Sequence, residues 1–157
     1  MVERKEYLQR LIDWKEEQVI TVVTGIRRCG KSTLLKQYQD YLKQKGVMEK
    51  QIISINFEDL EYEHLLNYRE LYIYIKDRLC PDKMTYIFLD EIQNVPDFPK
   101  VVDSLYVKNN TDVYITGSNS YLLSSELATL LSGRYVEISM LPLSFREYVT
   151  VTGRPQE

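Results

Sequence analysis

The sequence predicts an α/β fold in which helices cover both faces of a parallel β-sheet. Short runs of β-branched and other apolar residues alternate along the chain with stretches of helical periodicity, an arrangement typical of strand–helix–strand units. No internal repeat and no glycine- or serine-rich linker divides the 157 residues. A chain of this length with 44% hydrophobic residues can bury the core of one domain. We therefore expect residues 1–157 to form a single domain.

Five short apolar segments are predicted to be the strands of this sheet. The first is the β-branched run Gln-Val-Ile-Thr-Val-Val-Thr at residues 18–24, which is typical of a strand buried on both faces. The other four lie at residues 51–57, 85–89, 112–116 and 134–139. Since ligands of parallel sheets bind at the carboxyl ends of the strands, we expect the functional residues to follow these segments.

The spacing of apolar residues predicts the helices that cover the sheet. In residues 32–45 the apolar positions share one face, and Gly46 is expected to end the helix. Asp97 is expected to cap a helix over residues 98–108. Further helices are predicted at residues 4–13, 64–79 and 121–131, and another begins at Ser144, where the spacing is that of a capping box.

Composition excludes several classes of protein. Lys and Arg number 20 against 23 Asp and Glu, a net charge of −3, which disfavours a strongly basic nucleic-acid module. A local basic patch is not excluded by the net charge. Its positive side chains either bind nucleic acid or are ordinary solvated charges. These are Arg27, Arg28, Lys36, Lys43, Lys45 and Lys50.

Cysteine, histidine and hydropathy patterns point to a cytoplasmic protein without a structural metal. Cys29 and Cys80 lie far apart and are expected to be free thiols in a reducing compartment. They and the single His64 are too few for a zinc site. No apolar run approaches the ~20 residues that span a bilayer, and the charged residues at the start of the chain are not those of a signal peptide. We therefore expect no membrane partner.

The strongest motif is the glycine loop at residues 25–32, Gly-Ile-Arg-Arg-Cys-Gly-Lys-Ser. It matches G-x-x-x-x-G-K-[ST] and lies between a predicted strand and a predicted helix, as a phosphate-binding loop requires. Backbone N–H groups of such a loop point at an anion, and the helix N-terminus adds partial positive charge. Lys31 is expected to neutralise the β- and γ-phosphates, and the Ser32 hydroxyl is expected to bind Mg²⁺.

Other residues of this loop complete the predicted nucleotide contacts. We expect Gly25, Ile26, Gly30 and Thr33 to lie against the nucleotide. Arg27 and Arg28 either touch phosphate or are solvated. Cys29, beside Arg28 and a helix N-terminus, is either a reactive thiol that bound ATP would protect or a small filling residue.

An acidic pair follows the third predicted strand. Four apolar residues, Tyr-Ile-Phe-Leu, lead into Asp90 and Glu91, which places both carboxylates at the carboxyl edge of the sheet. Asp90 is expected to hold the Mg²⁺ and its water shell, and Glu91 to polarise a water for attack on the γ-phosphate. The added glutamate favours a protein that activates water over a phosphate-transferring kinase.

Five motifs in order resemble the predicted prokaryotic ATPases of the AAA+ superfamily, whose ATPase domain is often followed by a nuclease-like domain. They are the glycine loop, Phe-Leu-Asp-Glu-Ile-Gln at 88–93, Thr-Gly-Ser-Asn-Ser at 116–120, Leu-Ser-Gly-Arg at 131–134 and Leu-Pro-Leu-Ser-Phe-Arg-Glu at 141–147. The resemblance implies a P-loop NTPase three-layer sandwich with strand order 5-1-4-3-2. It also implies that residues 1–157 are an ATP-binding core, an N-terminal fragment without the family's helical lid and C-terminal domain.

The resemblance also assigns roles to polar residues beyond the loop. Ser118 or Asn119, at the tip of the fourth strand, would be the sensor between the γ-phosphate and the attacking water; alternatively, residues 118–120 cap the next helix. Arg134 would complete the site of a neighbouring subunit in a homo-oligomer, or pair with a surface acid such as Glu137.

These patterns predict a Mg²⁺-dependent ATPase whose nucleotide state is coupled to a partner or a C-terminal domain. Two alternatives stay open: a regulatory switch that binds ATP with little turnover, and a small-molecule P-loop kinase. The choice of ATP over GTP rests on the resemblance, since no guanine-reading Asn/Thr-Lys-x-Asp motif occurs.

Overall fold

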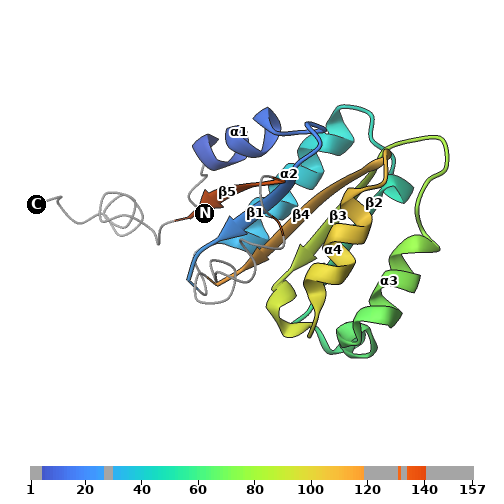
Figure 1. Cartoon of the computed structure of the whole chain (residues 1–157). Helices are drawn as coiled ribbons and strands as arrows, with labels where there is room; N and C mark the ends of the chain where they lie inside the picture. The colour runs from blue at the N-terminus through green and yellow to red at the C-terminus, as the bar shows by residue number, and fades with distance from the viewer. Residues whose placement is uncertain (1–4, 27–29, 119–130, 132–133, 141–157) are drawn as a thin grey trace, which may run out of the picture.

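A computed structural model describes residues 5–26, 30–118, 131 and 134–140 of the chain. Figure 1 shows the central sheet and the helices packed against it. The strands are β1 (Ile20–Thr24), β2 (Ile52–Asn56), β3 (Thr85–Asp90), β4 (Thr111–Gly117) and β5 (Tyr135–Ser139). The α-helices are α1 (Lys5–Asp13), α2 (Lys31–Gln44), α3 (Tyr68–Lys76) and α4 (Phe98–Tyr106), and short 3-10 helices are η1 (Glu49–Gln51), η2 (Leu60–Leu66) and η3 (Ile92–Asn94).

The five strands form one parallel sheet in the order β2-β3-β4-β1-β5, which confirms the predicted order. Every residue of β1 and β3 is buried, whereas the edge strand β2 has two buried residues and the edge strand β5 has one, Ile138. This difference follows from position, because central strands of a parallel sheet are covered on both faces. β4 lies between β1, which precedes the glycine loop, and β3, which ends at Asp90 of the acidic pair.

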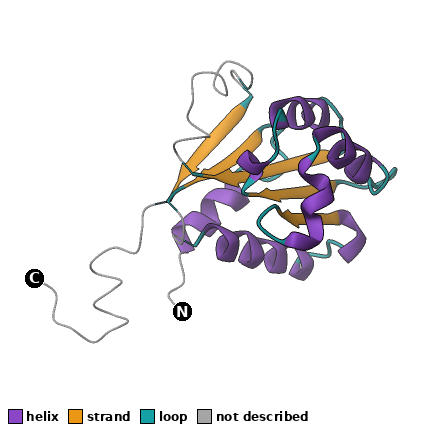
Figure 2. Cartoon of the chain, turned by 90° about the horizontal axis from the view of Figure 1, so that it is seen from below, coloured by secondary structure: helices purple, strands orange, loops and turns teal. Residues whose placement is uncertain are grey.

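Helices cover both faces of the sheet, as Figure 2 shows from below. One core joins α3 and α4 to the sheet through residues such as Leu71, Val102 and Ile87. The other joins α1 and α2 to the opposite face through residues such as Leu11, Leu34 and Phe88. The predicted three-layer sandwich is therefore confirmed.

Two predicted helices differ in detail from the structure. The segment expected as one helix over 64–79 is divided at Asn67, whose side chain accepts hydrogen bonds from the N–H groups of Arg69 and Glu70 and caps α3. Asp97 does precede α4, but its backbone is left-handed, with φ 62°, and its side chain makes no capping bond. The predicted side-chain cap is therefore wrong. The helix expected over 121–131 and the one from Ser144 lie outside the described residues, except for Leu131.

A polar network, buried except at Glu16, lies toward the amino ends of β3 and β4, on the α2 face. Asp112 accepts hydrogen bonds from the Tyr114 hydroxyl (2.7 Å) and from the Glu16 N–H (3.0 Å). The Tyr114 and Tyr38 hydroxyls lie 2.7 Å apart, and the Tyr86 hydroxyl donates to the Glu16 carboxylate. These residues tie the segment after α1 to α2, β3 and β4, and we call them the amino-edge cluster (Glu16, Tyr38, Tyr86, Asp112 and Tyr114).

Candidate functional site

The glycine loop leads from β1 into α2, as the motif predicts. Gly30 occupies the N-cap position of α2 with φ 98°, a left-handed conformation that other residues rarely adopt. Its carbonyl accepts from the Leu34 N–H at 2.9 Å and so begins the helix. The first turn of α2 contains no acidic residue, so the partial positive charge of this helix N-terminus suits an anion.

The ammonium group of Lys31 is buried at the base of this loop. Its Nζ donates to the carbonyl oxygens of Gly25 (2.7 Å) and Ile26 (3.1 Å), and the side chain of Glu91 lies 3.6 Å away. Only 4% of Lys31 is exposed. A buried cation needs an anion nearby, and in this structure the Glu91 carboxylate is that anion.

Ser32 and Asp90 lie side by side, although 58 residues separate them in the sequence. The Ser32 hydroxyl donates to Asp90 Oδ2 at 2.5 Å. Both are hard oxygen donors, and Mg²⁺ typically takes one or two protein oxygens and completes its shell with water and phosphate. Within the described ranges no group of three or more His, Cys, Asp or Glu could hold a metal. Ser32 and Asp90 are oxygen donors of the kind that such a Mg²⁺ site uses.

Glu91 turns back toward Lys31 because its backbone is left-handed, with φ 60° and ψ 49°. Its carboxylate accepts from the Gln93 side-chain amide at 2.8 Å, and its own carbonyl accepts from the Asn94 side chain at 3.0 Å. Glu91 is 7% exposed. A carboxylate in this position can accept a proton from a water beside the phosphates.

Thr116 is a site residue that the sequence reasoning missed. Its buried hydroxyl donates to Asp90 Oδ1 at 2.5 Å and accepts from the Glu91 N–H at 2.9 Å. The signal in the sequence is a polar residue near the end of the apolar strand β4, two positions before Ser118. Gln93, the partner of the Glu91 carboxylate, was also not singled out.

The remaining predicted residues divide into those near the loop and those outside the described chain. Gly25 and Ile26 follow β1, Thr33 lies in the first turn of α2, and Ser118 directly follows β4. Arg27, Arg28, Cys29 and Asn119 lie outside the described residues, so the roles expected for them stay predictions.

Arg134 lies at the amino edge of the sheet, opposite the glycine loop, because it directly precedes β5 and the first residue of β5 pairs with Ile20. Its guanidinium pairs with Asp103 on α4 and lies 5.5 Å from the centre of the Tyr106 ring. Arg134 therefore does pair with a surface acid, as the alternative expects, but this acid is Asp103, and Glu137 instead accepts from the Thr24 hydroxyl at 2.7 Å. Within its own chain Arg134 therefore lies at the wrong edge of the sheet to reach Lys31.

Lysines of the possible basic patch are solvent-exposed. Lys43 pairs with Glu49 at 2.7 Å, and Lys45 lies 5.6 Å from the centre of the Tyr41 ring. Lys36 and Lys50 are also exposed. These contacts are those of ordinary solvated side chains.

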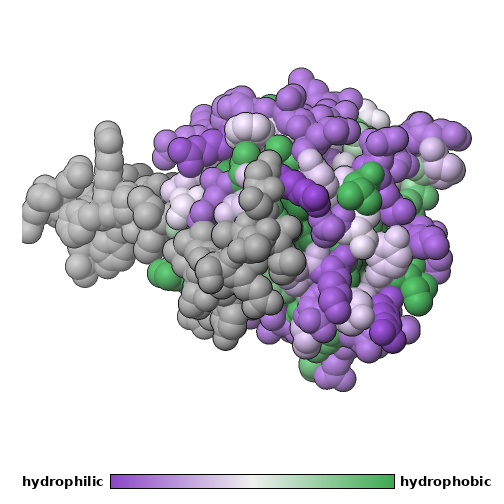
Figure 3. Space-filling model, in the orientation of Figure 1, coloured by the Kyte–Doolittle hydropathy of each residue, from purple (hydrophilic) through white to green (hydrophobic). Residues whose placement is uncertain are grey.

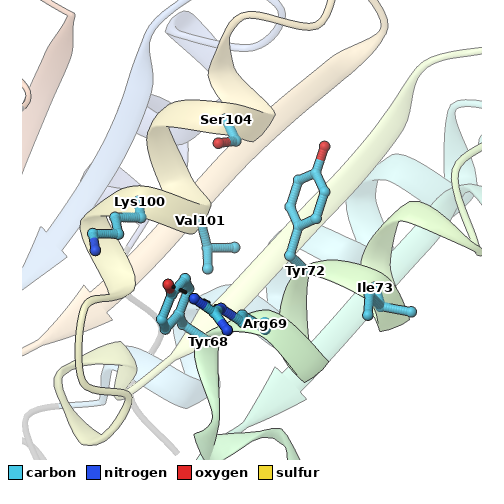
Figure 4. Close-up of a pocket in the computed structure, with 7 residues that line it drawn as sticks. All are labelled: Tyr68, Arg69, Tyr72, Ile73, Lys100, Val101 and Ser104. Atoms are coloured by element: carbon cyan, nitrogen blue, oxygen red, sulfur yellow. Dashed lines mark hydrogen bonds between the residues drawn. The ribbon is translucent and has the colours of Figure 1, made fainter.

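A separate groove lies between α3 and α4 on a surface that is largely hydrophilic (Figures 3 and 4). Its volume is about 340 Å³, and the Arg69 and Lys100 cations lie 5.6 and 5.2 Å from the centre of the Tyr68 ring. The groove shares no residue with the loop or the acidic pair, so it is not part of the phosphate site. It is lined by Tyr68, Arg69, Tyr72, Ile73, Lys100, Val101 and Ser104.

The strand order, the glycine loop after β1 and the acidic pair after β3 together define a P-loop NTPase fold. The family can be stated more closely. The chain belongs to the AAA domain family, whose model matches residues 17–149, and this confirms the resemblance to AAA+ ATPases. No helix in the described part of the chain is long and apolar enough to cross a membrane.

Similar proteins extend well beyond this chain. An uncharacterized protein of Haemophilus influenzae is 47% identical over 150 residues, which cover 95% of this chain and 38% of the relative. The uncharacterized protein MJ1544 of Methanocaldococcus jannaschii is 39% identical over 137 residues, or 83% of this chain and 28% of the relative. The chain thus spans less than two fifths of the length of these relatives.

Solved structures share the fold at low sequence identity. Cdc6p of Pyrobaculum aerophilum aligns with a TM-score of 0.65 and 14% identity, over 97% of this chain and 48% of that protein. AMPPCP-bound DnaA of Aquifex aeolicus aligns with a TM-score of 0.59 and 14% identity, over 94% of this chain and 48% of that protein. Family and fold together support a nucleotide-binding, ATPase-type function.

Proposed function

We propose that this domain binds ATP together with Mg²⁺ and hydrolyses it. The observation that carries the proposal is the convergence of Lys31, Ser32, Asp90 and Glu91 at the carboxyl edge of the sheet, with 3.6 Å between Lys31 and Glu91 and 2.5 Å between Ser32 and Asp90. A cation, two hard oxygen donors and a base within reach of one phosphate group are the parts that phosphoryl transfer to water requires.

Each side chain has a distinct part in this reaction. Lys31 binds and neutralises the terminal phosphates, while the N–H groups at the start of α2 orient them. Ser32 and Asp90 would hold the Mg²⁺, which when bound shields the phosphate charge. Glu91 orients a water and accepts its proton, and Gln93 fixes the carboxylate that does so.

Two observations favour ATP hydrolysis over the alternatives. Glu91 lies 3.6 Å from Lys31, a position from which its carboxylate can orient a water beside the terminal phosphate. AMPPCP is bound to DnaA, whose structure has this fold, and this supports an adenine nucleotide. A regulatory switch with little turnover would keep the same binding residues, so turnover separates it from an ATPase.

We further propose that Arg134 acts on the nucleotide of a neighbouring subunit and that the hydrolysis drives a partner or another part of the protein. The position of Arg134 at the opposite edge of its own sheet supports a role in trans. The relatives are longer than this chain, which leaves room for such a coupled part.

Replacing Lys31 with alanine tests the phosphate site. Lys31→Ala should weaken ATP binding by about tenfold or more, because a hydrogen bond to a charged group contributes about 1.5–3 kcal/mol. Calorimetry with ATP measures the effect, and Lys36→Ala, an exposed lysine on the same helix, is the matched control. Equal ATP affinity of Lys31→Ala and the unaltered protein would overturn the proposed site.

A further inference from the structure

We propose that Thr116 is a positioning residue for the metal-binding carboxylate and the base. Its hydroxyl joins Asp90 to the backbone of Glu91. The inference rests on the proposed ATP hydrolysis and names a residue outside the glycine loop and the acidic pair.

The hydrogen bonds of this hydroxyl are directional. A threonine hydroxyl has one proton to donate, and Thr116 gives it to Asp90 Oδ1 at 2.5 Å. The other oxygen of the same carboxylate, Oδ2, accepts from Ser32 at 2.5 Å. Asp90 is therefore held from two sides, by β4 through Thr116 and by α2 through Ser32, and its Oδ2 is kept on the side of the glycine loop.

The second bond of Thr116 fixes the backbone from which the base projects. Glu91 has φ 60°, a conformation that a residue with a side chain rarely adopts without support. Its N–H donates to Thr116 at 2.9 Å, and its carbonyl accepts from Asn94 at 3.0 Å. Both bonds favour the turn that directs the Glu91 carboxylate toward Lys31.

The place of Thr116 in the sheet suits this role. β4 lies between β1 and β3, and Thr116 is paired in register with Val23, two residues before the glycine loop. Its side chain is fully buried. A hydroxyl on a rigid central strand can hold two loops in a fixed relation more accurately than a residue on either loop.

The test compares Thr116→Val, which keeps the shape but loses the hydroxyl, with Thr116→Ser, which keeps the hydroxyl. The readouts are ATP turnover, ATP affinity with Mg²⁺ and with EDTA, and the urea midpoint of unfolding. Thr21→Val is the matched control, because Thr21 is equally buried on β1 and its hydroxyl has no hydrogen-bond partner among the described residues.

We expect Thr116→Val to lower turnover by about tenfold or more and to reduce the gain in ATP affinity that Mg²⁺ gives, while affinity in EDTA changes by less than about threefold. Thr116→Ser should keep turnover and the Mg²⁺ dependence of ATP affinity close to those of the unaltered protein. Thr21→Val should change neither quantity. A Thr116→Val protein with normal turnover and normal Mg²⁺ dependence would overturn the inference. A loss of turnover in Thr116→Val that the unfolded fraction explains, or an equal loss in Thr116→Ser, would also overturn it.

Failure of the proposed function has a different signature. If the unaltered protein binds ATP without hydrolysing it, the proposed hydrolysis is wrong. The effect of Thr116→Val on the Mg²⁺ dependence of binding then decides the role of Thr116 in positioning Asp90.

Discussion

The two edges of the sheet both contain buried polar groups, but only one has the composition of a phosphate site. At the carboxyl edge, Lys31 lies among hydroxyl and carboxylate oxygens, and we call this set the carboxyl-edge cluster (Lys31, Ser32, Asp90, Glu91 and Thr116). At the amino edge, tyrosine hydroxyls, the Glu16 N–H and the Lys15 ammonium group bond to the carboxylates of Glu16 and Asp112.

The two clusters differ in the hydrogen-bond donors that they can offer to a bound ligand. The amino-edge cluster links four elements through hydrogen bonds among its own members, as a structural network does. The carboxyl-edge cluster brings a buried lysine to the N-terminus of α2, where a buried cation and the helix N–H groups are donors suited to an anion. Burial of polar groups alone therefore does not indicate a functional site, whereas the kind of donor and its position at the strand ends make the carboxyl edge the candidate.

The largest expected effect is that of replacing Arg134. This residue lies at the amino edge of its own sheet and would act at the carboxyl edge of the sheet in another subunit. An arginine finger contributes about 10³–10⁵ in rate in well-studied NTPases, so Arg134→Ala should lower turnover of the oligomer by about 100-fold or more. The same change should lower the free energy of unfolding by less than about 1 kcal/mol, since the bond to Asp103 is a surface ion pair.

Mixing Arg134→Ala with Lys31→Ala tests whether the site is shared. Each variant lacks a different part of the shared site. In the mixture, an interface can combine the intact Lys31 of an Arg134→Ala subunit with the intact Arg134 of a Lys31→Ala subunit, so turnover should be regained there. Phosphate release measures it, and light scattering must show a mixed oligomer. No recovery in such an oligomer would assign Arg134 to a structural role within its own chain.

The contribution of Asp112, in the amino-edge cluster, to folding stability is expected to fall as pH rises. Burial raises the pKa of Asp112 from its ordinary value of 3.8 to about 6, against the lowering effect of its bonds to Tyr114 and Glu16. Because the pKa is higher in the folded protein, the contribution of this group to stability is complete below about pH 4 and is lost as pH rises through about 6.

The measurement compares unfolding in urea for the unaltered protein and Asp112→Asn at about pH 4 and pH 7. The advantage of the unaltered protein over the variant should shrink by on the order of 2 kcal/mol between the two conditions. A constant difference would mean that Asp112 does not titrate in this range.

The smallest expected effect is a loss of stability without a loss of nucleotide binding. Tyr114→Phe removes the hydroxyl that bonds to Asp112 and Tyr38 and should lower the free energy of unfolding by about 1–2 kcal/mol. Tyr41→Phe, also on the α2 face, is the control. ATP affinity of the folded protein should not change, and a weakened affinity would show that the two edges are coupled.

Much of the site was predictable because its main parts are contiguous in the sequence. The loop at residues 25–32 and the pair Asp90–Glu91 each follow an apolar strand, and parallel strands bring their carboxyl ends to one edge. All five strands were also predicted, since buried strands are short β-branched runs. The family resemblance supplied their order.

Contacts that depend on register and on side-chain direction were not predictable. Thr116 meets Asp90 across 26 residues, and Asp112 meets Glu16 across 96, so no local pattern links them. The pairing of Arg134 with Asp103 instead of Glu137 depends on how α4 packs beside the start of β5. The break before α3 is hidden in the sequence, because Asn67 caps this helix from within a segment whose apolar residues keep helical spacing.

The central claim is that the carboxyl-edge cluster activates water, and Glu91→Gln tests it most directly. ATP affinity by calorimetry and phosphate release are measured on the same preparation, with Glu63→Gln, an exposed glutamate, as the control. We predict that phosphate release by Glu91→Gln falls by about 100-fold or more while ATP affinity changes by less than about threefold. Normal phosphate release by Glu91→Gln, or phosphorylation of an added small alcohol by the unaltered protein, would contradict the account.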